Sequence, residues 1–243
     1  MAVHKFYRPQ IYMGGYDVQA DHSRVQINDS FDELDSTAFG NASKRHIAGL
    51  NVSTLEGEVF LQYAAGAIED LLRQFRGTVQ VYLITPDTAT VGDKCWHGQT
   101  LVHHANPVGG AVGEIHKTTW QSSGGNGYPP VRGQIFKAAG STTSSSNSAM
   151  VQLGAVSATQ RVGVAMHVLS VSGSTPTLDV TVRSDDNSTP TTPTTRITLT
   201  QANSVGAQFS SAAGAITDDW WGVTWTLGGG TPNFSFVVGL GIF

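Results

Sequence analysis

Residues 162–169 read Val-Gly-Val-Ala-Met-His-Val-Leu, a short run rich in apolar and β-branched residues. Runs of the same kind recur along the last third of the chain, at residues 178–183, 196–200, 221–227 and 234–238. Stretches of Gly, Ser, Pro and Asn separate them, as at residues 172–176 and 228–233. Short alternating strands at this spacing are typical of antiparallel sandwiches. The C-terminal part is therefore predicted to be an antiparallel β-sandwich of the jelly-roll or immunoglobulin-like kind.

The preceding half of the chain is also predicted to be mainly β. Strands are expected at residues 24–28, 51–63, 78–85, 95–104, 113–122 and 131–136. One segment, about residues 64–76, has helical spacing instead, with Ile68, Leu71 and Phe75 on one stripe and Gly77 positioned as a C-cap. A single amphipathic helix among strands must lay its apolar stripe on a sheet. The expectation is a β-sandwich or half-barrel with one flanking helix.

Composition narrows the class of protein. The 243 residues include 14 Lys+Arg and 18 Asp+Glu, and only 13% are charged, against about 25% in an ordinary soluble domain. No run approaches the roughly 18 apolar residues of a membrane span, so no membrane insertion is expected. Cys95 is the only cysteine, which excludes an intrachain disulfide. The mild net charge of −4 argues against a dedicated DNA-binding protein, whose footprint would be basic.

The charged residues divide the chain. Residues 1–140 contain 11 of the 14 basic residues and 13 of the 18 acidic ones. The seam, Gly140 to Ser148, is almost entirely Ser and Thr and has little apolar surface to bury. We therefore expect a first domain at 1–138, a linker at 139–150 and a second domain at 151–243.

Residues suited to catalysis or metal binding do not form a recognisable constellation. Phosphate-binding loops, nucleophile elbows and zinc-protease helices are absent from the sequence. His97 and His103 share a predicted strand face but lie roughly 20 Å apart. Neither an enzyme nor a cofactor or metal is expected. The Asp185-Asp186 and Asp218-Asp219 pairs leave calcium as an alternative to ordinary turns.

Three tryptophans near the C-terminus suggest a second alternative. Trp221 and Trp225 fall on one strand face and Trp220 on the other. An exposed Trp220 or Trp225 would offer a flat apolar surface on which a sugar ring can stack. The simpler interpretation, which we favour, places Trp221 and Trp225 in the core of the sandwich.

A series of short motifs between residues 28 and 136 carries more information than any one of them. In chain order they are Asp35-Ser36-Thr37-Ala38-Phe39-Gly40, Lys44-Arg45-His46-Ile47-Ala48-Gly49-Leu50, Leu55-Glu56-Gly57, the helix, Val81-Tyr82-Leu83-Ile84, Gly92-Asp93, Gly98-Gln99-Thr100-Leu101-Val102, Pro107-Val108-Gly109-Gly110-Ala111-Val112-Gly113-Glu114 and Trp120-Gln121. This order resembles that of the major tail (tail tube) proteins of long-tailed bacteriophages, over roughly residues 20–138. The second half resembles Ser/Thr-rich accessory domains of phage virion proteins.

The resemblance implies a non-enzymatic virion protein that is assembled in the host cytoplasm. Six copies would form a ring in which neighbouring sheets join into one barrel, and rings would stack into the tail tube. A tape-measure protein and a tail terminator are the implied partners, and DNA would pass through the lumen without specific binding. The 151–243 domain would decorate the exterior of the tube.

Physical considerations agree with such an assembly. Joining sheets between copies removes exposed strand edges that otherwise promote aggregation. A barrel of about 24 strands would be roughly 40–50 Å across, which leaves a channel. Few lysines suit a wall that must not hold phosphates.

Two segments are predicted to contact neighbouring copies. Residues 28–50 are a long polar stretch without clear periodicity, expected as a loop that docks on the next ring through Phe31, Leu34, Phe39 and Ile47. The N-terminal arm, residues 1–16, has a similar density of apolar side chains, among them Phe6, Tyr7, Ile11 and Tyr12. A capsid decoration or tail-tip protein and a carbohydrate-binding module remain alternatives.

Overall fold

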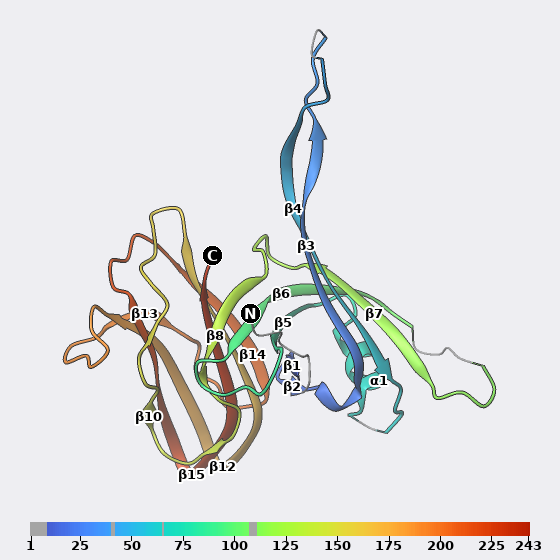
Figure 1. Ribbon diagram of the computed structural model, residues 1–243. Coiled ribbons are helices and arrows are strands. Elements are labelled where there is room, and N and C mark those ends of the chain that lie inside the picture. Colours follow the sequence, from blue (N-terminus) through green and yellow to red (C-terminus); the bar gives the residue numbers. More distant parts are fainter. Residues whose placement is uncertain (1–8, 40–41, 65, 107–110) are drawn as a thin grey trace. The chain divides into compact units, whose positions relative to one another are not determined.

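The computed structural model describes residues 9–39, 42–64, 66–106 and 111–243. It contains one α-helix, α1 (Ile68–Phe75), and a 3-10 turn, η1 (Gln19–Asp21) (Figure 1). The strands are β1 (Gln10–Met13), β2 (Tyr16–Asp17), β3 (His22–Asp35), β4 (His46–Phe60), β5 (Val79–Thr85), β6 (Lys94–Ala105), β7 (Lys117–Gly124), β8 (Val131–Lys137), β9 (Ser141–Thr142), β10 (Ser146–Asn147), β11 (Val151–Gln152), β12 (Arg161–Asp185), β13 (Thr194–Thr198), β14 (Gly206–Ala213) and β15 (Trp220–Ile242). The mainly β fold with one short helix confirms the predicted class.

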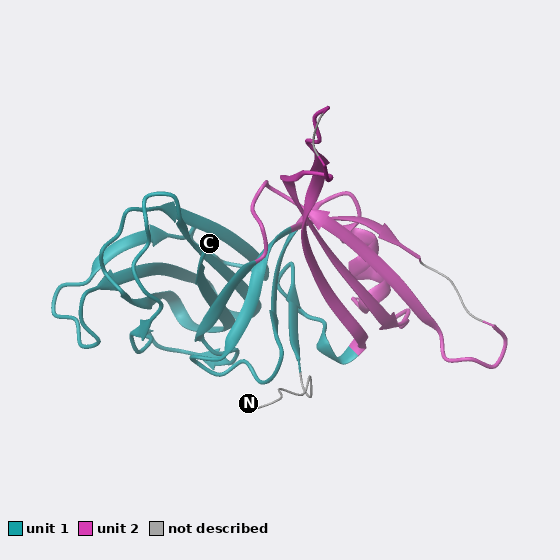
Figure 2. Cartoon of the chain, turned by 45° about the horizontal axis from the view of Figure 1, so that its top comes forward, with its two compact units in different colours: residues 1–20, 80–99, 131–243 teal, residues 21–79, 100–130 magenta. Residues whose placement is uncertain are grey.

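The chain forms two compact units, coloured separately in Figure 2. Unit 1 comprises residues 1–20, 80–99 and 131–243, and unit 2 comprises residues 21–79 and 100–130. These units do not follow the expected division at residue 138, because β8 pairs with β15 and β1 pairs with β5 inside unit 1. The expected linker is not free either. Its residues form β9 and β10, which both pair with β15.

Unit 1 is built around one long antiparallel ribbon, β12 with β15. Their pairing runs from Val162↔Ile242 to Asp185↔Trp220. Alternate residues in both halves of both strands belong to a single buried cluster, which includes Val164, Val180, Val223 and Phe236. A straight strand of 25 residues would span about 80 Å, so the ribbon must fold back on itself to bury both halves together. The result is a sandwich in which each long strand belongs to both layers.

The fold in this ribbon is made by the same four-residue pattern in each strand, Gly173-Ser174-Thr175-Pro176 and Gly229-Gly230-Thr231-Pro232. The pairing register shifts there. Thr175 and Thr231 have φ of 46° and 48°, in the left-handed region that β-branched residues rarely adopt. A Cβ at Gly229 would lie 2.4 Å from the Thr175 carbonyl oxygen, so glycine is required for the two strands to approach at the corner.

Unit 2 is an antiparallel arrangement of β3, β4, β7 and the second part of β6, with α1 against one face of these strands (Figure 2). The helix is shorter than the predicted 64–76, but its apolar stripe is as expected, with Ile68, Leu71, Leu72 and Phe75 buried. Gly77 follows the helix with φ of 82°. No helix in the described ranges is long and apolar enough to cross a membrane.

Candidate functional site

The most distinctive feature of unit 2 is a two-stranded arm. The pairing of β4 with β7 ends at Thr54↔Ser123, whereas the pairing of β3 with β4 continues to Asp35↔His46. Residues 29–53 therefore leave the sheet as an isolated hairpin, which is called the arm below and stands at the top of Figure 1. The expected loop at 28–50 is thus corrected: most of it is strand. The strand was missed because Asn, Asp and Glu, which dominate residues 28–35, are uncommon in strands.

The two faces of the arm differ in chemistry. Directly opposed residues of an antiparallel pair share a face. Leu34 lies opposite Ile47, and Val52, which pairs with Ser30 nearer the sheet, lies on the same face. The register shifts between Phe31 and Glu33, and a Cβ at Gly49 would meet the Leu34 Cγ at 3.1 Å. The bulge therefore lies at Gly49 and Leu50 of β4, and both residues are on the same face as Leu34. Leu34, Ile47, Leu50 and Val52 form what is called the apolar face.

The opposite face of the arm is polar and internally bonded. The Asn51 amide donates to Asp29 at 2.7 Å, and the His46 Nδ1 lies 3.2 Å from a Glu33 carboxylate oxygen. Phe31 is the apolar exception on this face. Because its polar groups already have partners on the arm, this face is suited to solvent.

A clasp of hydrogen bonds holds the outer end of the arm. The Asp35 carboxylate accepts from the Thr37 backbone N–H at 2.8 Å, and these bonds to Thr37 lower the pKa of Asp35. The Thr37 hydroxyl accepts from the Arg45 N–H at 2.9 Å, and Ser36 donates to the Arg45 carbonyl. The Asp-x-Thr and Arg motifs noted in the sequence therefore meet here. Their role is to shape the arm.

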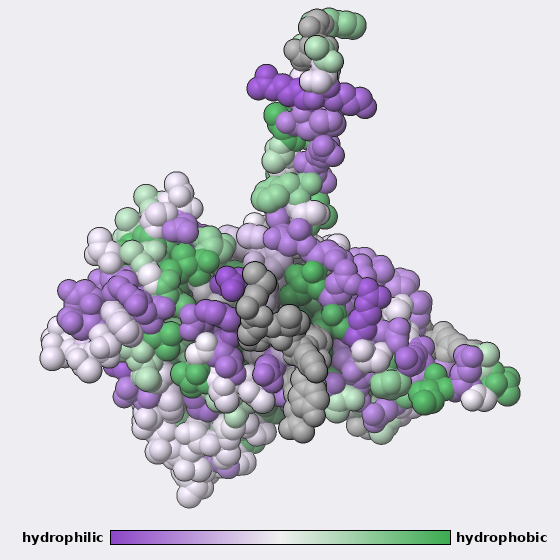
Figure 3. All heavy atoms as spheres, in the orientation of Figure 1, coloured by the Kyte–Doolittle hydropathy of each residue, from purple (hydrophilic) through white to green (hydrophobic). Residues whose placement is uncertain are grey.

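The four predicted docking residues all lie on the arm, and all are exposed. The exposed fraction is 63% for Phe31, 50% for Leu34 and for Ile47, and Phe39 is fully exposed. Leu50, which was not predicted, is 80% exposed. Figure 3 shows hydrophobic residues interspersed with hydrophilic ones along the arm. The arm is thus a projecting ribbon with several exposed apolar side chains, a feature typical of surfaces that bind other proteins.

A groove lies at the root of the arm. It has a volume of about 350 Å³. Its walls come from β4 and from the segment after β7, and its lining residues are Leu50, Asn51, Val52, Ser53, Gly124, Gly127, Tyr128 and Pro129.

One face of the unit 2 sheet is mainly polar, with Phe60, opposite Lys117, as its apolar exception. The residues that share it through the registers of β3, β4 and β7 are Arg24, Gln26, Asn28, Thr54, Glu56, Glu58, Lys117, Thr119, Gln121 and Ser123. Arg24 donates to Gln26, Gln26 to Asn28, and Asn28 to the Thr54 hydroxyl at 3.2 Å. This set is called the polar sheet face, and its two cations balance its two carboxylates.

The charges of the polar sheet face are partly paired. Lys117 lies 2.9 Å from Glu58, and bonds to Lys117 and Ser23 lower the pKa of that carboxyl. The opposite side of the same strands is buried, including Leu55, Val59 and Trp120. The sheet therefore has an inner and an outer surface.

The other predicted contact residues do not lie at a surface. Ile11 and Tyr12 are buried in β1, opposite Ile84 and Leu83. They belong to the core of unit 1, which corrects the expectation that they contact a neighbour. Phe6 and Tyr7 fall outside the described residues.

The structure also shows where the three tryptophans near the C-terminus lie. Trp221 and Trp225 are buried in the unit 1 core, as the favoured interpretation held. The Trp225 indole donates to the Ser144 carbonyl at 3.2 Å and lies edge-on to Phe236. This corrects the glycan-stacking alternative at Trp225, because its ring faces are covered. Trp220 is half-buried in β15.

Two buried histidines, His97 and His167, were not expected to be core residues. Within the part of the chain that the structure describes, neither ring nitrogen of His97 has a hydrogen-bond partner, whereas His167 accepts from the Gly15 N–H at 3.3 Å through Nδ1. Burial lowers the pKa of each to about 3. Among the described residues, no three His, Cys, Asp or Glu side chains are grouped so as to hold a metal.

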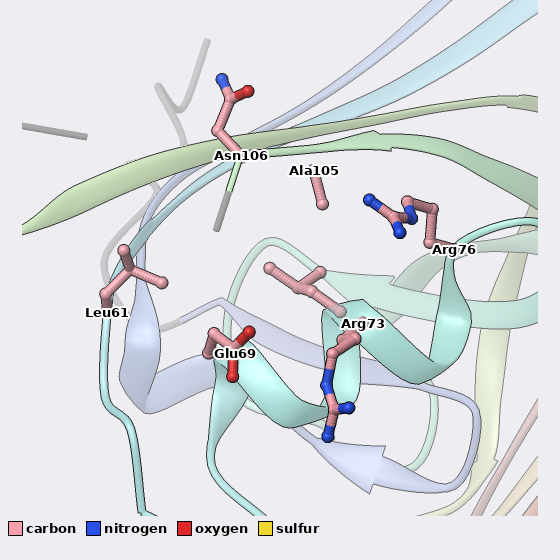
Figure 4. A pocket seen from close by; sticks show the side chains of 7 residues that line it. Leu61, Glu69, Arg73, Arg76, Ala105 and Asn106 are labelled. Carbon is pink, nitrogen blue, oxygen red and sulfur yellow. The ribbon is translucent and has the colours of Figure 1, made fainter. Parts of the chain in front are cut away.

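A small pocket of about 120 Å³ lies beside α1 (Figure 4). Glu69, Arg73 and Arg76 reach it from the helix, and Ala105 and Asn106 from the end of β6. Arg73 is paired with Asp70 at 2.8 Å. The described lining residues supply no hydroxyl, thiol or imidazole group, and the charged groups of the pocket are the Glu69 carboxylate and the Arg73 and Arg76 guanidinium groups.

Comparisons with known proteins find structural likenesses. One similar chain belongs to the virion of a native gene transfer agent particle, with 15% identity over 49% of this chain and 92% of that chain and a TM-score of 0.37. A second is the SPP1 Dit protein (gp 19.1), described as a paradigm of the hub adsorption apparatus in phages that infect Gram-positive bacteria. It is 14% identical over 97% of this chain and 99% of that chain, with a TM-score of 0.38.

A third similar chain comes from the tail of an empty gene transfer agent particle with C6 symmetry, at 13% identity over 44% of this chain and 78% of that chain and a TM-score of 0.35. No protein family and no curated protein sequence matches the chain. The solved structures to which this β-rich fold is similar thus include components of phage and gene transfer agent tails.

Proposed function

We propose that this protein is a structural subunit of a phage tail tube, which self-assembles into stacked hexameric rings and so forms the conduit through which DNA leaves the virion. The proposal rests on the ordered sequence motifs and on the geometry of unit 2. In this role the protein has no catalytic function, and a tape-measure protein and a tail terminator act as its partners during assembly.

The observation that carries the proposal is the arm. Leu34, Ile47 and Leu50 project on one face of a hairpin whose two strands, in the part of unit 2 that the structure describes, pair only with each other beyond Thr54. Burying one such side chain fully stabilises a contact by about 1.5–3 kcal/mol. An arm that exposes several of them, together with Phe31 and Phe39, suits a subunit that is completed by a neighbour.

A strand edge supports the same conclusion. Within the described residues, β4 is the only strand that pairs with β3 (His22–Asp35), so no strand lies along the other edge of β3. Open edges of this length invite pairing with another chain. Pairing with a strand of a neighbouring copy around a ring satisfies these groups and extends the sheet.

The polar sheet face suits the wall of such a conduit. Each Lys or Arg that contacts a phosphate adds affinity for DNA through counterion release. Here the cations Arg24 and Lys117 are balanced by Glu56 and Glu58, and apart from Phe60 the rest of the face consists of amides and hydroxyls. Such a surface lets DNA slide without holding it.

Electron microscopy of the purified protein at increasing concentration tests the proposal. We expect hollow tubes from the unaltered protein and none from the double variant Leu34→Asp with Ile47→Asp, because two carboxylates would have to be buried in the contact. Val205→Asp, an exposed apolar residue of unit 1, is the matched control and should still form tubes. Tubes from the double variant, or a protein that stays monomeric at every concentration, would contradict the proposal.

A further inference from the structure

Three side chains form a row across unit 1 at one end of the long ribbon. Trp220 of β15 lies opposite Asp185 of β12 and opposite Gln152 of β11. Directly opposed residues share a face, with Cα atoms about 5 Å apart. Ser184 and Trp221, one position along, are buried. Because neighbouring residues of a strand point to opposite faces, the row that contains Trp220 lies on the outer face of the sheet.

Trp220 contributes a partly exposed indole to this row. The side chain is half-buried, and within the described part of the chain its N–H has no hydrogen-bond partner and is not enclosed. The indoles of Trp221 and Trp225, in contrast, donate to the carbonyl oxygens of Gly154 and Ser144. Trp220 therefore presents an apolar ring surface with a free donor at its edge.

Arg183 lies beside the row, two residues before Asp185 and opposite Gly222. A Cβ at Gly222 would lie 3.5 Å from the Arg183 Nε and 2.5 Å from the Met150 Sδ, so both of these side chains lie over the glycine. No ion pair joins the Arg183 guanidinium to a carboxylate of the described residues. Its Nε is enclosed without an acceptor, whereas its two terminal nitrogens are neither enclosed nor bonded in that part of the chain. Packing therefore holds the side chain in place while its terminal donors stay free.

The acceptors beside the ring are carboxylates. Asp185 accepts from the Asn187 backbone N–H at 3.0 Å through one oxygen, which leaves lone pairs on the other. Asp219 accepts from the Gln152 amide at 2.6 Å and so fixes the orientation of that amide. Together with the exposed Asp186, three carboxylates accompany one guanidinium group. The local charge therefore disfavours an anionic ligand.

The side chains of Gln152, Arg183, Asp185 and Trp220 are together called the Trp220 patch. Its strands are already paired on both sides, since β15 lies between β12 and β11. A peptide therefore cannot add to the patch as a further strand, and a ligand has to be recognised by side chains alone. The patch offers one apolar ring, free N–H donors and carboxylate acceptors. A saccharide matches this set, because its ring has an apolar C–H surface and hydroxyl groups that both donate and accept.

We infer that the Trp220 patch binds an uncharged saccharide, whose ring packs on the Trp220 indole while its hydroxyl groups accept from Arg183 and donate to Asp185. Arg183 and Trp220 are diagonal neighbours, about 7–8 Å apart between Cα atoms, a span that one sugar ring can bridge. The patch lies entirely in unit 1, whereas the arm and the polar sheet face lie in unit 2. The inference therefore does not depend on the proposed assembly.

An array of immobilised neutral, amino and acidic oligosaccharides, probed with the labelled full-length chain, tests the inference. We expect binding to neutral members of the array. Trp220→Ala should lower the apparent affinity for every bound saccharide about tenfold, and Trp220→Phe should lower it less, because a phenyl ring keeps part of the stacking surface. Asp185→Asn, which removes the charge of the acceptor at nearly constant size, should lower the affinity about fivefold.

Asp179→Asn is the matched control. Asp179 lies on the same strand face, about 20 Å from Asp185, and its carboxylate accepts from Gln201, so its substitution should leave the affinity unchanged. Circular dichroism checks the fold of each variant, and Asp185→Asn still decides the question if Trp220→Ala does not fold. A chain that binds no saccharide, or only acidic ones, overturns the inference. So does binding that survives Trp220→Ala, or that falls equally with the two asparagine variants. Tube formation is observed separately by electron microscopy, so each of these results leaves the proposed function standing.

Discussion

One neighbouring side chain, Trp120, leaves no room for a residue larger than glycine at position 57. Gly57 lies opposite Trp120 in the β4–β7 register, and a Cβ there would come within 2.3 Å of the indole Nε1. That indole nitrogen also donates to His22 at 3.0 Å, so the ring has little freedom to move. The Leu-Glu-Gly and Trp-Gln motifs of the sequence are thus two sides of one packing contact.

Replacing this glycine tests the contact. We expect Gly57→Ala to lower the free energy of unfolding of unit 2 by about 1–3 kcal/mol through overpacking, measured by urea unfolding followed by tryptophan fluorescence. Gly206→Ala, where a Cβ meets open space, should change stability by less than about 0.5 kcal/mol. Equal effects of the two substitutions would show that Trp120 does not require the glycine.

The buried histidines make unit 1 sensitive to acid. The folded state keeps His97 and His167 neutral, with pKa values of about 3 against 6.5 in the unfolded chain. Below pH 6.5 the unfolded chain therefore binds more protons, and stability that is complete above pH 6.5 is lost progressively toward pH 3. The two groups together cost on the order of 4 kcal/mol by pH 5.

Substituting one histidine at a time separates their contributions. His97→Leu should halve the acid sensitivity at no cost at pH 8, because neither ring nitrogen has a partner to lose. His167→Leu leaves the Gly15 N–H without its acceptor and should cost about 1–3 kcal/mol at pH 8. Denaturant unfolding at pH 8 and pH 5 measures both, and parallel pH curves for the wild type and His97→Leu would refute the assignment.

At the scale of elements, the clasp determines whether the arm is preformed. Thr37→Val keeps the shape of the side chain but removes the acceptor of the Arg45 N–H. A hydrogen bond worth about 1 kcal/mol corresponds to roughly fivefold faster hydrogen exchange at the Arg45 amide, which mass spectrometry or NMR detects. The melting temperature should stay the same, since the clasp is exposed. Unaltered exchange at Arg45 would mean that the arm is held by its strand pairing alone.

The helix and the arm differ in how well the sequence predicts them. The helix was predictable because Ile68, Leu71 and Phe75 repeat at helical spacing in a segment that Gly77 ends. The strands of the arm were not predictable. Residues 28–35 of β3 are mostly polar and have no buried face, so nothing imposes an alternating pattern on them. The docking residues of the arm were nevertheless identified, since isolated Phe and Leu in a polar stretch are conspicuous whether the stretch is loop or strand.

The same limit applies to unit 1. Alternation predicted the strands on either side of Thr175 and Thr231, but nothing local indicates that the strands continue through both turns. The Gly-x-Thr-Pro sequences resemble ordinary turns, and only the packing of both halves into one core makes them corners. The units also interleave along the chain, which a division by composition cannot detect.

For the whole molecule, the proposed conduit wall predicts that added positive charge increases the retention of DNA inside the tube. Thr119→Lys with Ser123→Lys adds two cations to the polar sheet face. Tubes of this variant should retain double-stranded DNA at low salt, and the salt dependence should steepen by about 0.9 for each new phosphate contact. Ala158→Lys with Thr189→Lys adds the same charge to exposed positions of unit 1 and should leave retention inside the tube unchanged. Equal retention by both variants would place the DNA elsewhere.

Unit 2 projects its arm as a hairpin on which Leu34, Ile47 and Leu50 are exposed. In the tube that we propose, the last ring added would expose the same apolar side chains as the ring before it, so nothing in the subunit would end growth. A defined length would then have to be set by a separate ruler and a separate stop.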